Sequence, residues 1–205
     1  MKKVILLLVL ILCTMIGAKQ LSESEKNEML KQFEIFQNAV KNKDIETVKS
    51  MVKFPLNEES GYALILDENA DLSGGITEKT FLKYKNGILE RLDEITKVKV
   101  NYSKNNFSEY YKDGANTEDK KRKYYQKGDE PGYYYKDKNN KEVYHTICDL
   151  KVNGEFSDNG ILEIKSSSFS NKLTPLASED CDSSIIYYFK LINNKLKLYE
   201  VKMAG

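Results

Sequence analysis

His145 is the only histidine in the chain and the first residue to consider for chemistry. An imidazole titrates near neutral pH and can serve as a general acid or base. The alternation of residues 144–152 predicts a strand with His145 on the face opposite Cys148. No second catalytic group stands at a fixed spacing from it, so a structural strand histidine is the favoured interpretation and no catalytic residue is assigned. Our candidates for lining a small-ligand pocket are His145 and Tyr187.

Cys148 and Cys181 are the candidate partners of a disulfide. They are the two cysteines that follow the N-terminal segment, and an even pair in an oxidising compartment is typical of a disulfide. Such a bridge closes a loop of about 33 residues and contributes about 3–4 kcal/mol through chain entropy. The alternative is a pair of unlinked buried thiols. The chain has no Cys-x-x-Cys motif, so redox catalysis is not expected.

One loop carries oxygen-bearing side chains at every second position. They are Asp67, Asn69, Asp71 and Ser73, with Glu78 at the twelfth place. Alternating oxygen ligands and a late glutamate are the ligands of a calcium loop. Leu72, however, stands where the sharp turn of such a loop needs glycine, and Gly74 replaces the usual apolar eighth residue. A solvated loop with a helix cap is therefore favoured, and no metal or cofactor is predicted.

Two tyrosine-rich stretches are candidates for recognition. Residues 118–125 combine acidic and basic side chains with two tyrosines, as in a basic–aromatic nucleic-acid patch. The net charge of +1 argues against nucleic-acid binding, and a solvated hairpin tip is favoured. Tyr133, Tyr134 and Tyr135 follow Pro131-Gly132 and are either a recognition surface or ordinary cross-strand packing. Both interpretations stay open.

The first eighteen residues predict an export signal. Lys2 and Lys3 precede an apolar run over 4–12, and small residues lead to Ala18. The run is shorter than the roughly 20 residues of a spanning helix. We therefore expect a single domain over 19–205 with no spanning segment, exported to the periplasm or secreted. An uncleaved anchor and a lipid attached at Cys13 are the alternatives.

The elements that must position these residues are helices first and strands later. Apolar residues at 29, 33, 36 and 40 predict a helix that is capped by Ser22 or Ser24 and ends near Asn42. Asp44 caps a second helix that ends before Pro55. The run 61–66 predicts a short strand, and Thr77 caps a third helix that extends past Leu92.

From Val98 onward the apolar period is two. Strands are expected over 98–102, 144–152 and 160–166, followed by a hairpin of 185–191 and 196–203 that turns at Asn193-Asn194. A 205-residue chain with helices first and strands later is typical of the α+β class.

Several strings resemble the nuclear transport factor two-like superfamily, also called ketosteroid isomerase-like. The string FEIFQNAVKNKDIETVKSMVKFPL, residues 33–56, looks like the paired opening helices of exported bacterial members. Gly75-Ile76-Thr77 with Phe81 resembles the start of their third helix, and 188–205 is similar to their final hairpin. The resemblance implies N-terminal helices packed in a curved antiparallel sheet, a cone-like fold with a pocket.

Members of that superfamily include isomerases, dehydratases, transport factors, immunity proteins and binding modules, so the fold does not fix the function. No phosphate loop, dinucleotide fingerprint, Gly-x-Ser-x-Gly or zinc helix motif occurs. The leading hypothesis is a non-enzymatic exported binding module for a small ligand or an envelope protein. The alternatives are an isomerase or lyase that uses a cone pocket, which needs only a carboxylate and a hydrogen-bond donor, and a protein-interaction or immunity role for the tyrosine-rich hairpins.

Overall fold

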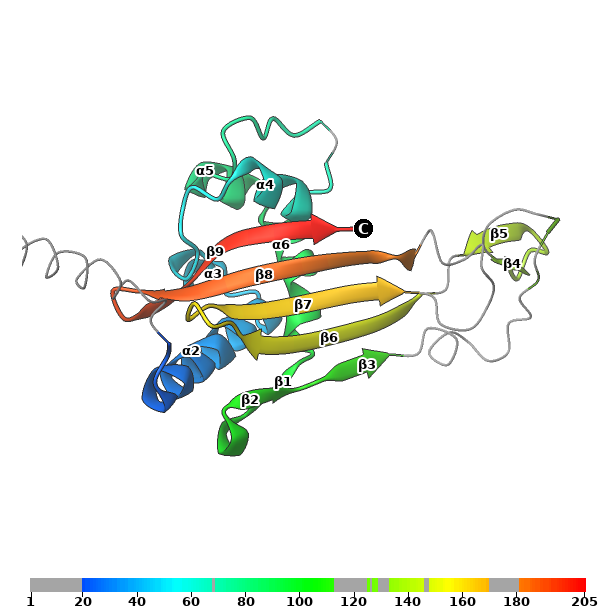
Figure 1. The fold of residues 1–205 in the computed structure, drawn as a ribbon. Helices are drawn as coiled ribbons and strands as arrows, with labels where there is room; N and C mark the ends of the chain where they lie inside the picture. The colour runs from blue at the N-terminus through cyan, green and yellow to red at the C-terminus, as the bar shows by residue number, and fades with distance from the viewer. Residues whose placement is uncertain are drawn as a thin grey trace, which may run out of the picture.

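The computed structural model describes residues 20–67, 69–112, 125, 127–128, 133–145, 148–169 and 181–205. The predicted export signal, with Cys13, and the stretch 118–124 lie outside the described residues. Helices fill the N-terminal half of the described chain and antiparallel strands fill the remainder, which confirms the predicted α+β class (Figure 1).

The first two helices begin where the capping residues predict. Helix α2, Glu23–Lys41, starts with a capping box in which the Ser22 side chain accepts from the backbone N–H of Glu25. Helix α3, Ile45–Ser50, starts at Asp44, whose carboxylate accepts from the backbone N–H of Thr47. The predicted apolar stripe of α2 is buried in the core.

Helix α4, Glu58–Leu64, overturns the prediction of a strand over 61–66. The Asn57 side chain accepts from the backbone N–H of Ser60, and Glu58 and Glu59 occupy the first turn. This cap and the favourable charge at the helix N-terminus establish a helix before the apolar run begins. A short apolar run does not distinguish a strand from a buried helix, so the capping residue decides.

The third predicted helix is two helices. Thr77 caps α5, Glu78–Lys83, as expected, but the chain breaks at Tyr84 before α6, Lys85–Asp93. A 3-10 turn, η1, Glu94–Thr96, follows α6, and a second, η2, Tyr102–Lys104, comes later in the chain. Phe81 is buried by α5, whereas Ile88, Leu89 and Leu92 are buried by α6.

The main sheet has five antiparallel strands in the order β3-β6-β7-β8-β9. Their bounds are β3 Tyr110–Lys112, β6 Asp149–Phe156, β7 Leu162–Phe169, β8 Ser183–Ile192 and β9 Lys195–Ala204. The β8–β9 hairpin is confirmed. Asn193 and Asn194 have φ of 53° and 60°, the left-handed conformation that a two-residue turn requires.

Two small sheets accompany the main one. The strands β1, Lys99–Asn101, and β2, Asn106–Ser108, pair with each other, as do β4, Tyr133–Lys136, and β5, Glu142–His145. The single strand predicted over 144–152 is therefore wrong. Its first residues end β5 in one sheet and its last residues begin β6 in another. Alternation alone does not show where a chain leaves one sheet and enters the next.

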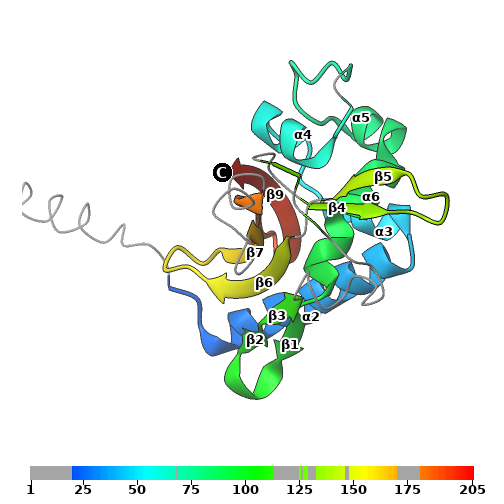
Figure 2. The same ribbon diagram turned by 90° about the vertical axis from the view of Figure 1, so that its right-hand side faces the viewer.

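Helices α2, α3 and α6 lie on one face of the main sheet, and α4 lies beside β9 at its edge (Figures 1 and 2). The other face, turned towards the viewer in Figure 1, carries no described helix or strand. The face towards the helices is the core face, and its residues form one hydrophobic cluster with the helices.

The outer edge of β9 is occupied by hydrogen bonds to the helical half. Leu198 exchanges backbone bonds of 2.8 Å with Met51 and Lys53, and its neighbour Leu196 donates to the Gln32 side chain at 2.6 Å. The Ser60 hydroxyl accepts from Val201 N–H at 2.7 Å and donates to Val201 C=O at 3.1 Å. These bonds use backbone groups that would otherwise offer another strand a place to pair.

Candidate functional site

The core face of β7 and β8 changes from apolar to polar along its length. Towards the β8–β9 turn, Leu162 pairs with Phe189. Towards the opposite end, Ser168 of β7 pairs with Ser183 of β8, and Ser166 takes the inward place between. The two-residue period that buries Leu162 thus continues through serines, which a sheet packed only for stability would not need.

The apolar end is filled by aromatic rings. The ring of Phe189 contacts Phe33 at 5.3 Å and Phe36 at 5.2 Å between centroids, both edge to face. All three side chains are completely buried. Such packing leaves no room for a ligand at this end of the core face.

The polar end surrounds a cavity of about 240 Å³, which we call the polar hollow. Helix α6, the turn η1 and three strands line it with Arg91, Glu94, Leu150, Ser166, Ser168, Ser183 and Ile185. The hollow is therefore suited to a small ligand.

Arg91 is the residue of the polar hollow that has a buried donor without a described partner. The buried Nε atom has no hydrogen-bond partner among the residues that the structure describes. Its Nη1 atom lies 4.0 Å from Glu94 Oε1, at the limit of an ion pair. An unsatisfied buried donor costs about 1–3 kcal/mol. A ligand with an acceptor group would remove that cost.

Glu94 supplies an oriented carboxylate next to Arg91. The Ser166 hydroxyl donates to Glu94 Oε2 at 2.6 Å, a charge-assisted hydrogen bond between the sheet and η1. The bond fixes one oxygen of the carboxylate, while Oε1 faces the guanidinium. The hollow therefore presents a positive and a negative group side by side.

Tyr187 lies on the core face between the apolar and polar ends and has no exposed surface. Its hydroxyl donates to the backbone carbonyl of Arg91 at 3.1 Å. Burial, and secondarily the charge of Glu94, raises the pKa of Tyr187 far above its usual range. The hydroxyl therefore stays protonated and holds the last turn of α6 against β8.

The two residues predicted to line a common pocket lie in different sheets. Tyr187 is in β8 of the main sheet, whereas His145 ends β5, where its backbone pairs with Tyr133. The His145 side chain lies outside the described part of the chain. Ligand binding by either residue remains a prediction.

The Cys148–Cys181 disulfide is confirmed. Cys148 directly precedes β6, and Cys181 lies two residues before the first residue of β8. Leu150 and Ser183, which line the polar hollow, are each two residues from a cysteine of the bridge. The disulfide therefore joins two of the strands that form the hollow at the end where they begin.

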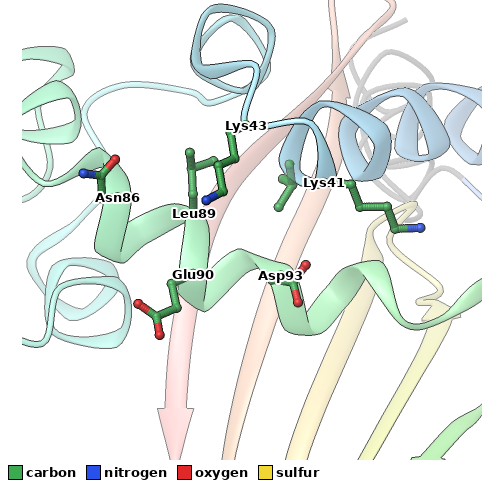
Figure 3. Close-up of a pocket in the computed structure, with 7 residues that line it drawn as sticks. Lys41, Lys43, Asn86, Leu89, Glu90 and Asp93 are labelled. Atoms are coloured by element: carbon green, nitrogen blue, oxygen red, sulfur yellow. The ribbon is translucent and has the colours of Figure 1, made fainter.

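A second hollow of about 550 Å³ lies between the end of α2 and α6, and we call it the α2–α6 groove (Figure 3). Val40 and Leu89 are its buried apolar residues. Its charged residues are Lys41, Lys43, Glu90 and Asp93, and the Asp93 carboxylate is already paired with Lys97 at 2.6 Å. Figure 3 shows Lys41 pointing away from Leu89. The groove contains no unsatisfied buried polar atom of the described chain, so the polar hollow is the stronger candidate.

The acidic loop uses its oxygens to bind its own backbone. Asp67 accepts from Asn69 N–H at 3.0 Å, and Asp71 accepts from the N–H and hydroxyl of Ser73. These bonds from Ser73 lower the pKa of Asp71. Across the described ranges, no group of three or more metal-ligating side chains is found. The loop closes on itself through Asx turns, as the favoured interpretation expects.

The tyrosines of the β4–β5 hairpin make local contacts where their side chains are described. The rings of Tyr125 and Tyr134 lie 6.1 Å apart, and the Tyr125 hydroxyl donates to Glu142 at 2.7 Å. The side chains of Tyr133 and Tyr135 lie outside the described part. Cross-strand packing therefore accounts for Tyr134, and a recognition role for the stretch stays a prediction.

Comparison with known proteins finds no family model, no curated protein and no solved structure that matches this chain. Among the described residues, no helix has the length and apolar character needed to cross a membrane.

The residues of the polar hollow were missed by reasoning from the sequence. Ser166 and Glu94 are 72 residues apart in the chain, so no linear motif joins them. Two signals were present. Serines continue the inward period of β7, and Arg91 is one of only two arginines among 32 basic residues. A guanidinium is chosen over an ammonium where a planar, multidentate donor is needed.

Proposed function

We propose that the protein is a non-enzymatic binding module that takes a small polar ligand in the polar hollow. The observation that carries this proposal is that Arg91, a residue of the cavity lining, has a buried Nε donor with no described partner. The ligand would provide the missing acceptor. The rigid sheet on one side and α6 on the other give the hollow fixed walls.

We propose further that the protein works outside the cytoplasm, either in the periplasm or in the medium. A structural disulfide is what an oxidising compartment permits, and residues 1–18 have the composition of an export signal. Lipid attachment at Cys13 is the alternative route to the envelope. Membership of the nuclear transport factor two-like superfamily, with its cone-like packing, belongs to the same proposal. Helices on one face of an antiparallel sheet support it.

A second candidate function is that of a small-molecule isomerase or lyase. It is favoured by Glu94, because a carboxylate and the donors of Arg91 line one hollow. These are the minimal parts of a proton-transfer site. The buried Tyr187 hydroxyl does not add to them, since it is bonded to a backbone carbonyl. Chemical turnover of a bound ligand would favour this function over simple binding.

The experiment tests the binding site by placing a large side chain on β7 so that it fills the polar hollow. Ser168 lines it, whereas its neighbour Ser167 is on the opposite face, where its hydroxyl bonds to Ser184 at 3.0 Å. We compare the wild type, Ser168→Phe and the matched control Ser167→Phe in a ligand-observed NMR screen of small polar compounds. Compounds that bind the wild type and Ser167→Phe should fail to bind Ser168→Phe. Equal binding to all three folded proteins would show that the hollow is not the site.

A further inference from the structure

We infer that the ligand of the polar hollow is a small carboxylic acid that also carries a hydrogen-bond donor, an amino or hydroxyl group, on a short carbon skeleton. This inference rests on the proposed function and adds the chemical class of the ligand. It follows from the groups that line the hollow and from the partners that they lack.

Arg91 selects the carboxylate. The planar guanidinium offers Nε–H and Nη–H as a fork that matches the two oxygens of a carboxylate. The existing contact to Glu94 engages only Nη1, and at 4.0 Å it is long. Arg91 lines the hollow and its buried Nε lacks a described partner, so the guanidinium has not used all of its donors.

Glu94 selects the donor. One of its oxygens accepts from Ser166, and a carboxylate can accept several hydrogen bonds at once. The same negative charge disfavours a ligand with two negative charges, such as a phosphate, because like charges would meet in one small cavity. A carboxylate that carries an ammonium or hydroxyl group suits both charged residues.

The remaining walls set the size and the shape. The hydroxyls of Ser168 and Ser183 make no hydrogen bond to another described residue, so they add two adaptable partners. Leu150 and Ile185 supply the apolar wall, which suits a short aliphatic group. The volume of about 240 Å³ is below the roughly 300 Å³ at which pockets for drug-sized ligands begin. Small amino acids and hydroxy acids combine these properties.

The test uses the full folded protein and probes of matched size. We measure affinities by titration calorimetry or NMR for L-alanine and L-lactate, which have both groups. Propionate lacks the donor, and isopropylamine and propan-2-ol lack the carboxylate. L-alanine or L-lactate should bind at least tenfold more tightly than each probe that lacks one group. If propionate binds as tightly as L-alanine and L-lactate, the inferred need for a donor group on the ligand is wrong. If isopropylamine or propan-2-ol binds more tightly than they do, the inferred need for a carboxylate is wrong.

Two variants assign the groups. Arg91→Lys keeps the charge and the backbone carbonyl that binds Tyr187, but it loses the fork, so the carboxylate probes should bind at least tenfold more weakly. Glu94→Gln should narrow the difference in affinity between L-alanine and propionate, because the negative charge that attracts the ammonium group of L-alanine is gone. Unchanged affinities in both variants would overturn the inference.

The inference and the proposed function can fail separately. If no carboxylate probe binds, but other compounds bind the wild type and not Ser168→Phe, the inferred ligand class is wrong and the binding function stands. If Ser168→Phe binds every compound as the wild type does, the binding function falls as well.

Discussion

The two ends of the core face are built from the same two strands, β7 and β8, and differ in what fills them. At one end Leu162 and Phe189 meet the rings of α2 and leave no space. At the other end the half-buried Ser168 and the exposed Ser183 lie on the same face and a cavity remains. The same strand register therefore supports close packing at one end and an unsatisfied charged group at the other.

The apolar end therefore stabilises the fold, whereas the polar end is the candidate binding site. Close packing gives the apolar end its stability through burial and dispersion. The polar end is less closely packed. There the Cys148–Cys181 bond joins β6 to β8, and the Ser166–Glu94 hydrogen bond joins β7 to η1. Proteins commonly accept such local losses at sites that bind.

The largest effect should come from emptying the apolar end. Phe189→Ala removes a completely buried ring that contacts two others, so we expect it to lower the free energy of unfolding by about 3–5 kcal/mol. Ser168→Ala, at the polar end of the neighbouring strand, should change it by less than about 0.5 kcal/mol. Urea unfolding measures both variants. Similar losses in the two would remove the distinction between the ends.

The next effect concerns the covalent link at the polar end. Replacing both cysteines by alanine frees a loop between residues 33 positions apart, which should cost about 3–4 kcal/mol by chain entropy. The loss should be accompanied by weaker ligand binding in the polar hollow, because the strands that line it are no longer joined. Unfolding curves of the oxidised wild type, the reduced wild type and the double variant measure the cost. Equal stability of all three would show that the bond does not hold this end.

Gly154, in β6, tests how tightly the side chains beside the apolar end are packed. A Cβ at this position would lie 2.7 Å from Ile164 Cδ1 and 2.8 Å from the Phe107 ring. Gly154→Ala should therefore destabilise by about 1–3 kcal/mol through overpacking. Gly87→Ala is the matched control. Gly87 lies in helix α6, and a Cβ there would meet nothing within 4 Å. The substitution should therefore stabilise the protein by about 0.5–1 kcal/mol. A neutral Gly154→Ala would mean that Phe107 does not pack as described.

The parts of the fold that local rules determine could be predicted from the sequence. The caps at Ser22, Asp44 and Thr77 and the Asn193-Asn194 turn each act within four residues, and all of them are found. The strand predicted over 61–66 was wrong because an apolar run fits either element, whereas the Asn57 cap before it selects helix α4. The boundary between β5 and β6 failed because alternation carries no information on which sheet a strand joins.

The candidate site could not be predicted in the same way. In the sequence, Arg91 and Glu94 look like ordinary exposed residues of a charged helix. Glu94 reaches Ser166, and Arg91 comes to line the same cavity, only when α6 and η1 pack against the sheet. The pairing of Cys148 with Cys181 was accessible because only two cysteines were available outside the N-terminal segment. A contact between residues far apart in the chain can be predicted when the composition leaves few possible partners, as with two cysteines. Serines and lysines are so numerous that they leave many possible partners.

The smallest effect lies at the boundary between the two ends, at Tyr187. Tyr187→Phe keeps the buried ring and removes the hydroxyl that donates to Arg91 C=O at 3.1 Å. At neutral pH we expect a loss of about 1 kcal/mol, the net value of one buried hydrogen bond. The same hydroxyl should also make the stability of the wild type depend on alkaline pH.

The sign follows from the raised pKa of Tyr187 in the folded state. Above pH about 10, tyrosine in the unfolded chain loses its proton while the buried hydroxyl keeps it, so the wild type loses about 1.4 kcal/mol per pH unit from this group. Tyr187→Phe lacks this loss. The stability difference between the two proteins should therefore shrink above pH about 10 and vanish near pH about 11. Tyr102 and Tyr199, whose pKa values are raised to about 12, contribute equally to both proteins and cancel. Urea unfolding from pH 8 to about 11 gives the comparison, and parallel pH dependences would show that Tyr187 is not held neutral between the packed end and the polar hollow.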